Sequence, residues 1–158
     1  MITTVINFFL SYLLLYKYAT LFVIAYLAAL ILPLPSNTTL LASSAFASQG
    51  YLSITIVFLV AFSANVLGDI TGFWLSRKYG KNMLMKTPLA TILVSQKYID
   101  MEKVFTKNAG ITIFTTRFFG GVGPLVNIVS GFSERISLTQ FLLYGIPGEF
   151  VYVSFFTM

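Results

Sequence analysis

Three charged residues lie within apolar sequence and are the first candidates for chemistry: Asp69, Arg117 and Glu149. A charge at the centre of a transmembrane helix costs about 2.5–3.5 kcal/mol on insertion scales, so it is expected to be paired, protonated or bound to a ligand. Asp69 precedes Arg77 by about eight positions, which places it roughly 12 Å inside the end of a helix. We predict that Asp69 and Arg117 lie at membrane depth, and we keep Glu149 as a further titratable candidate whose depth the sequence leaves open.

Arg117 is the residue best suited to bind a ligand, because a guanidinium forms two parallel hydrogen bonds with a phosphate. The glycine-rich turn that follows includes Gly121 and Gly123. It would expose backbone N–H groups at the start of a second half-helix, where an anion is favoured. One interpretation is that Arg117 binds an anionic lipid head group. The other is a structural salt bridge with Asp69 that locks the turn, and the sequence leaves both open.

Two residue types that are common in catalytic sites are missing, because the chain has no cysteine and no histidine. A thiolate nucleophile, a Ser-His-Asp triad and an imidazole metal site are therefore excluded. The five carboxylates include no pair at catalytic spacing. We predict that the protein is not an enzyme and that it has no metal or other cofactor.

The composition indicates a membrane protein with a single membrane domain over residues 1–158. Apolar residues make up 57% of the chain, charged residues make up 9%, and the mean hydropathy is +0.86. Soluble domains have about 45–50% apolar and about 25% charged residues, so this chain could not cover a soluble surface. The net charge of +5 does not indicate nucleic acid, because the basic residues follow the topology pattern of a membrane protein.

The first half of the domain, residues 18–80, contains three apolar pieces. Residues 18–32 and 51–75 are close to spanning length, and Lys17 marks an interface or a break between helices. Residues 36–48 would form a helix of only about 20 Å and are rich in Ser, Thr and Asn. We therefore predict a re-entrant helix, buried among other helices. Asn37, at its start, would cap the helix or hydrogen-bond an unsatisfied backbone group.

Small residues recur every fourth position around Asp69, at Ala64, Gly68, Gly72 and Ser76. Such a seam permits close contact between helices. The contact would serve packing alone, or it would bring Asp69 against a polar partner.

A basic connector, residues 81–108, separates the two halves. Seven of the ten Lys and Arg residues lie between positions 77 and 107, which places this segment in the cytoplasm. Within it, residues 98–105 suit a surface helix that is either a solvated linker or a contact for lipid head groups. The first sixteen residues lack a basic region, so we expect no signal peptide.

The second half, residues 109–158, is also interrupted. Three glycines and a proline between positions 120 and 124 predict two half-helices, about 109–119 and 125–131, joined by a turn. Residues 138–158 are long enough to span, with a kink expected at Pro147 and Gly148. The interrupted segments occupy similar places in the two halves, so the predicted fold is all-α, with transmembrane and re-entrant helices in a loose inverted repeat.

Two motifs in this order resemble the DedA family of membrane proteins, which is also called the VTT-domain or SNARE-associated type. The element Gly68-Asp69-x-x-Gly72-Phe73-x-x-Ser76-Arg77-x-x-Gly80 follows a Pro-rich segment at Pro35, and Phe114-x-x-Arg117-Phe118 comes later. The resemblance covers about residues 18–155. The family has a Glu where this chain has Asn37, and a second Arg where it has Gly123. Members are also typically longer at the C-terminus.

The resemblance implies a multi-pass lipid transporter of the cytoplasmic membrane, which moves a phosphate-bearing lipid such as undecaprenyl phosphate or a phospholipid. Arg117, Asp69 and Asn37 with Gly121 and Gly123 would form the lipid site. The loss of Glu at Asn37 makes passive scrambling more plausible than proton or sodium coupling. A homo-oligomer and the identity of the lipid stay open. The alternative is a non-transporting assembly or scaffold protein with a structural Asp69–Arg117 pair.

Overall fold

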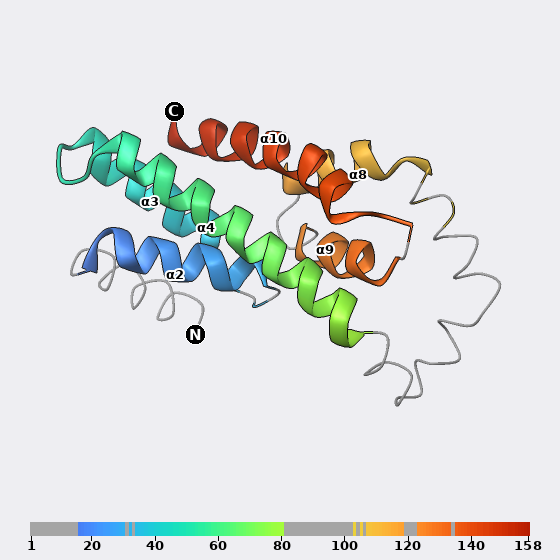
Figure 1. The fold of residues 1–158 in the computed structure, drawn as a ribbon. Helices are drawn as coiled ribbons and strands as arrows, with labels where there is room; N and C mark the ends of the chain where they lie inside the picture. Colours follow the sequence, from blue (N-terminus) through green and yellow to red (C-terminus); the bar gives the residue numbers. More distant parts are fainter. Residues whose placement is uncertain are drawn as a thin grey trace. The chain divides into compact units, whose positions relative to one another are not determined.

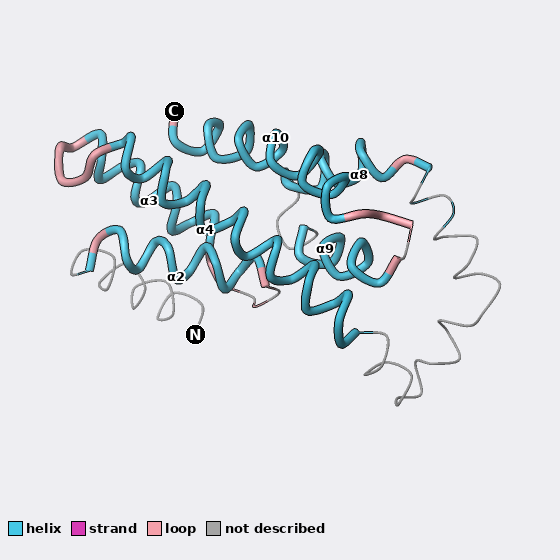
Figure 2. The backbone as a smooth tube through the Cα atoms, viewed as in Figure 1, coloured by secondary structure: helices cyan, strands magenta, loops and turns pink. Residues whose placement is uncertain are grey.

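A computed structural model describes residues 16–30, 32, 34–80, 103, 105, 107–118, 123–133 and 135–158. Within these ranges the regular secondary structure is helical throughout (Figure 1, Figure 2). The chain divides into two compact units, which we call unit 1 (Met1–Asp69 and Glu149–Met158) and unit 2 (Ile70–Gly148). The chain passes from unit 1 to unit 2 within helix α4 and returns within α10. The single membrane domain over residues 1–158 stays a prediction, because this division into two units does not test it.

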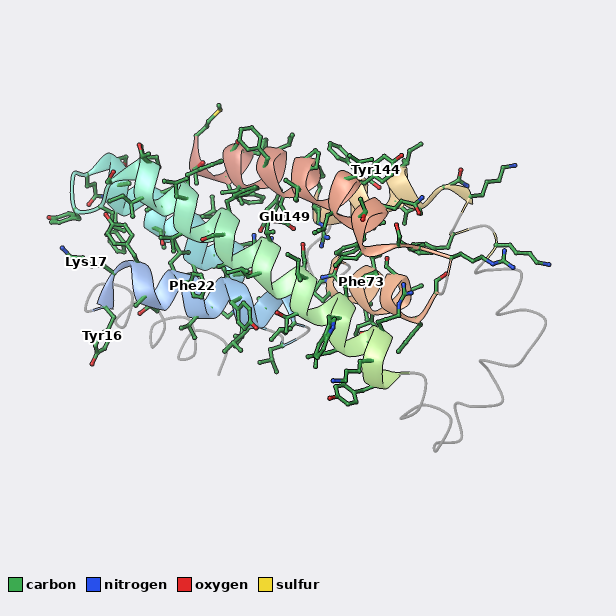
Figure 3. All side chains as sticks on the ribbon, in the orientation of Figure 1. Tyr16, Lys17, Phe22, Phe73, Tyr144 and Glu149 are labelled. Atoms are coloured by element: carbon green, nitrogen blue, oxygen red, sulfur yellow. The ribbon has the colours of Figure 1, made fainter. Side chains whose placement is uncertain are left out.

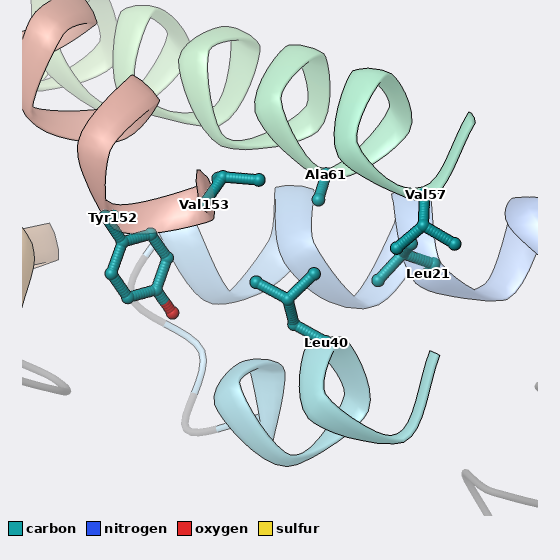
Figure 4. Close-up of a cluster of buried hydrophobic side chains, with 6 residues drawn as sticks. All are labelled: Leu21, Leu40, Val57, Ala61, Tyr152 and Val153. Carbon is teal, nitrogen blue, oxygen red and sulfur yellow. The ribbon is translucent and has the colours of Figure 1, made fainter. Parts of the chain in front are cut away.

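Unit 1 combines α2 (Tyr18–Ala29), α3 (Ser36–Ser48), the first part of α4 (Ile54–Leu75) and the last part of α10 (Leu138–Thr157). Lys17, with a φ of 49°, directly precedes α2, and residues 1–15, on the other side of the predicted break, lie outside the described residues. The four helices bury one apolar cluster, in which Leu21 and Leu40 face Val57 and Val153 (Figure 4). This cluster holds unit 1 together.

The polar helix α3 matches the predicted 36–48 segment, and the hydroxyls of Thr39, Ser43, Ser44 and Ser48 are bonded to backbone carbonyls. Thr39 Oγ1 donates to the carbonyl of Pro35 at 2.8 Å, and Ser43 Oγ donates to that of Thr39 at 2.8 Å. Ser44 Oγ also reaches the carbonyl of Phe156 on α10 at 3.1 Å. Because hydroxyls bonded in this way are satisfied, a helix rich in Ser and Thr is compatible with an apolar environment.

The first two residues of the predicted small-residue seam, Ala64 and Gly68, are buried in unit 1, where α2 and α4 approach closely. Ala64 is fully buried, and a Cβ built on Gly68 would lie 2.7 Å from the carbonyl oxygen of Tyr26. Only glycine permits that approach without a shift of one helix.

Unit 2 contains the end of α4, the short η1 (Ser76–Gly80), α8 (Ala109–Thr115), η2 (Thr116–Phe118), α9 (Gly123–Phe132) and the first part of α10. Its apolar cluster includes Phe73 and Phe141, whose ring centroids lie 4.8 Å apart. Phe73 projects from α4 in Figure 3. The two half-helices predicted around the glycine-rich turn are present, and the second begins at Gly123 with Pro124 in its first turn, where proline is tolerated.

The helix α10 continues through Pro147 from Leu138 to Thr157. The predicted re-entrant geometry and inverted repeat stay predictions. The predicted connector helix at 98–105 and most of the basic connector lie outside the described residues. Among the described helices, the one that is long and apolar enough to cross a membrane is Ile54–Gly80, with 27 residues.

Candidate functional site

Arg117 lies in unit 2, on the 3-10 turn η2 that continues α8. The side chain is buried, with 7% of its surface exposed. Its guanidinium carbon lies 5.7 Å from the ring centroid of Phe141 on α10. A buried guanidinium against an aromatic face is stabilised by the ring quadrupole.

Three glycines surround the Arg117 side chain. A Cβ built on Gly123, at the start of α9, would lie 3.4 Å from Nη1, and one on Gly145 would lie 3.4 Å from Nη2. A Cβ on Gly148 would lie 3.1 Å from Cγ. We call this arrangement the glycine cradle, defined by Gly123, Gly145 and Gly148. Side chains at these positions would crowd the Arg117 side chain, so the glycines let the backbone of α9 and α10 lie close to it.

The cradle lies at the N-terminal end of α9, a helix of ten residues. The first N–H groups of a helix have no partner within it, and the helix dipole is positive there. A phosphate near Gly123 would therefore meet backbone N–H groups as well as the guanidinium of Arg117. This arrangement favours the binding of an anion. Gly121, the other glycine predicted for the site, lies outside the described residues.

One face of α9 is buried and carries two polar side chains that sequence reasoning missed. Asn127 and Ser130 are fully buried and lie on the same face as Gly123 and Gly131. Ser130 Oγ has no hydrogen-bond partner within the part of the chain that is described. The i, i+3 spacing of these polar residues between the two glycines is the signal that could have identified this face.

Arg77, a residue of the sequence motif, lies in unit 2 and binds the other end of α9. Its Nε donates to the carbonyl of Gly131 at 2.7 Å, and Nη2 donates to that of Ser133 at 2.8 Å and to that of Ile136 at 2.5 Å. These carbonyls belong to the last turn of α9 and the segment after it, where a cation is favoured. Gly131 itself packs against the backbone of α4, since a Cβ there would lie 2.6 Å from the carbonyl oxygen of Phe73.

Asn37 does not cap α3, which corrects the sequence-based expectation. The N-cap position of α3 is Pro35, and no side chain caps it. Asn37 lies one residue inside the helix, where its Oδ1 accepts a hydrogen bond from the hydroxyl of Tyr152 at 2.6 Å. The side chain therefore links α3 to α10 within unit 1.

Two buried carboxylates belong to unit 1. Glu149 is 5% exposed and its Oε2 accepts a hydrogen bond from Asn65 Nδ2 at 3.0 Å, and Figure 3 shows it on α10. Asp69 is 4% exposed and lies one turn beyond Asn65 on α4. Asn65 is a further site residue that sequence reasoning missed, although its position four residues before Asp69 places both on one helix face.

The structure thus groups the predicted residues by unit. Asn37, Asp69 and Glu149 belong to unit 1, whereas Arg117 and Gly123 belong to unit 2. The pairing of Asp69 with Arg117 stays a prediction. The other motif residues have different surroundings. Gly72 is buried, Gly80 faces the ring of Phe132, and Phe118 is 40% exposed.

Comparisons with known proteins agree with the motifs. The family model of the VTT domain matches residues 34–158. An uncharacterized membrane protein of Synechocystis is 29% identical over 78% of this chain and 56% of its own length. Similar proteins are an uncharacterized membrane protein of Haemophilus influenzae, 26% identical over 70% of this chain and 53% of its own, and the membrane protein YkoX of Bacillus subtilis, 25% identical over 76% and 56%.

The chain spans about half the length of these curated relatives. No solved structure matches it. Because the family model covers most of the chain and each of these relatives is named as a membrane protein, the chain belongs to the VTT-domain family of membrane proteins, which is the DedA family that its motifs resemble.

Proposed function

We propose that the protein moves a phosphate-bearing lipid across the cytoplasmic membrane, as a flippase or scramblase. The observation that carries the proposal is the buried Arg117 in a glycine cradle at the N-terminal end of α9. Membership of the VTT-domain family supports the same class of function, since lipid transport is what the resemblance implied.

The proposed chemistry is recognition of a phosphate without covalent change. The guanidinium of Arg117 would bind two phosphate oxygens, and the N–H groups of the first turn of α9 would bind a third. Glycines at positions 123 and 145 lie next to the guanidinium, so a head group bound there would meet backbone and not side chains at these two positions. The second Arg of the resembled motif is Gly123 here, so a head group of lower charge fits better than a dianionic phosphate.

Asp69 and Glu149 are buried carboxylates of unit 1. We propose them as the groups that could take up a proton during transport. Asn37 is neutral where the resembled family has Glu, so passive scrambling is the simpler proposal.

The experiment is a lipid-translocation assay with the purified protein in vesicles, over a panel of head groups. R117A should abolish the movement of phosphate-bearing lipids while the protein still inserts, and R117K should retain only part of it because it cannot bind in a bidentate manner. R135A is the matched control, since Arg135 is an exposed arginine of unit 2. Wild-type rates from R117A would overturn the proposed role. An imposed pH gradient that accelerates transport would indicate proton coupling.

The alternative function is that of a non-transporting scaffold protein. The contact of Arg117 with Phe141 favours this alternative, because it gives the arginine a packing role. A double variant with exchanged charges, D69R with R117D, separates the two. If stability returns without transport, Arg117 binds the head group. If both return, the pair is structural.

A further inference from the structure

The last turn of α4 and the η1 segment that follows it carry an exposed group of two aromatic rings and a lysine. Trp74 is 50% exposed and Tyr79 is 47% exposed. Their ring centroids lie 6.4 Å apart in an edge-to-face arrangement. The Lys78 Nζ lies 4.7 Å from the Trp74 centroid and 5.2 Å from that of Tyr79, so the ammonium contacts both rings. These cation–π contacts hold the lysine next to two side chains that each carry a hydrogen-bond donor.

This group lies at the end of the apolar, exposed face of the helix that is long enough to span a membrane. Leu67 is 47% exposed and precedes Trp74 by two turns, and Lys78 follows Trp74 by one turn on the same face. Hydrocarbon of about 30 Å takes about 20 helical residues, and Trp74 is the next-to-last residue of the 22-residue α4. An exposed stripe that changes from leucine to tryptophan, lysine and tyrosine at this length marks a membrane–water interface.

We propose that Trp74, Lys78 and Tyr79 bind the phosphate of an anionic phospholipid at that interface. The rings fix the position of the ammonium, whose N–H groups are left to meet phosphate oxygens, while the indole N–H and the phenol hydroxyl lie at the same depth. The helix C-terminus adds no positive charge of its own, so Lys78 supplies the attraction. This lipid stays at the boundary of the protein, and the inference does not depend on lipid translocation.

The first experiment measures the depth of Trp74, which is the only tryptophan of the chain and so reports without a label. The full-length protein is placed in phosphatidylcholine vesicles whose lipids carry bromine at graded depths along the acyl chain. Emission should be quenched most by bromine close to the head group. Strongest quenching by bromine near the acyl end places Trp74 at the bilayer centre and overturns the proposal. Absence of quenching by every lipid shows that another protein surface covers Trp74, and overturns it too.

The second experiment measures the response of Trp74 emission to phosphatidylglycerol added to the same vesicles. K78Q should weaken the apparent affinity for phosphatidylglycerol about fivefold, which corresponds to about 1 kcal/mol for one lysine at an anionic surface. K78R should keep the response, because the charge and the ring contacts remain. K107Q is the matched control, since it removes the same charge from another exposed lysine of unit 2. An equal response in K78Q and wild type, or an equal loss in K78Q and K107Q, overturns the site.

Discussion

The hydroxyl of Tyr152 on α10 donates a hydrogen bond to Oδ1 of Asn37 on α3, at 2.6 Å. Tyr152 is buried, with 7% of its surface exposed, and its ring belongs to the apolar cluster of unit 1 (Figure 4). The polar tip of a core residue therefore ends on an amide at the position where the resembled family has a glutamate. A neutral amide accepts this bond without gaining or losing a proton itself, so the acceptor on α3 does not titrate as a glutamate would.

Removal of that hydroxyl gives the first prediction. Y152F should lower the free energy of unfolding by about 1 kcal/mol, because Asn37 loses its partner from α10 while the ring stays packed. Y144F deletes a hydroxyl from the same helix at an exposed residue, and should change stability by less than about 0.5 kcal/mol. Thermal unfolding of both variants in the same detergent measures this difference in stability. Equal melting temperatures for the two variants would show that the bond contributes nothing.

The second prediction concerns Arg77, whose guanidinium binds the carbonyls at the end of α9. R77A should destabilise the protein by about 1.5–3 kcal/mol, because a charged donor is removed from several acceptors at once. R77K should recover only part of this, since one ammonium cannot reach the carbonyls of Gly131 and Ile136 in the same geometry. R135A is again the control. Unfolding followed by tryptophan emission tests the series, and a loss in R135A as large as in R77A would contradict the assignment.

The third prediction tests the close approach of α9 to α4. G131A places a methyl group 2.6 Å from the carbonyl oxygen of Phe73 and 2.6 Å from Cβ of Ser76, so one helix must move. We expect a loss of about 1–3 kcal/mol, typical of overpacking. The control is A64G on the seam of α4, which removes a methyl group instead and should cost about 1 kcal/mol through helix propensity. Stability of G131A at or above wild type would show that the helices separate without cost.

The sequence predicted much of the helical framework because hydropathy and the prolines and glycines that end helices act on residues close in the chain. The polar segment 36–48 forms α3 with the predicted bounds, and helical segments end at Phe118 and begin at Gly123 on the two sides of the predicted turn, whose residues 119–122 lie outside the described ones. Both depend on residues close in the chain, namely the flanking prolines and glycines. The burial of Asp69 and Arg117 also follows from their isolation within apolar sequence, whereas the depth of Glu149, which is buried as well, was left open.

Partners at long range could not be predicted in this way. The contact of Arg77 with Gly131 and that of Tyr152 with Asn37 join residues far apart in the sequence, and no local spacing encodes them. Asn37 was expected to cap its own helix because local capping is the commoner use of asparagine at that position. The fold provided a better partner, since the buried hydroxyl of Tyr152 needs an acceptor.

The last prediction separates the site from the fold at Gly145, a member of the glycine cradle. G145A adds a methyl group 3.4 Å from Nη2 of Arg117 and 3.8 Å from Cγ2 of Ile113, distances at which little has to move. Alanine also favours the helix by up to about 1 kcal/mol, so stability should be kept or raised. Lipid translocation should nevertheless fall severalfold, because the methyl group takes space beside the guanidinium.

The comparison for this experiment is G148A, whose Cβ would lie 3.1 Å from Cγ of Arg117 and 3.2 Å from the carbonyl oxygen of Phe114. That variant should lose stability as well as transport, because a backbone atom cannot yield as a flexible side chain does. Thermal unfolding and the translocation assay are therefore run on the same preparations of both variants. If G145A is stable and transports at the wild-type rate, the space beside Arg117 is not where the head group binds, and the cradle only packs the arginine.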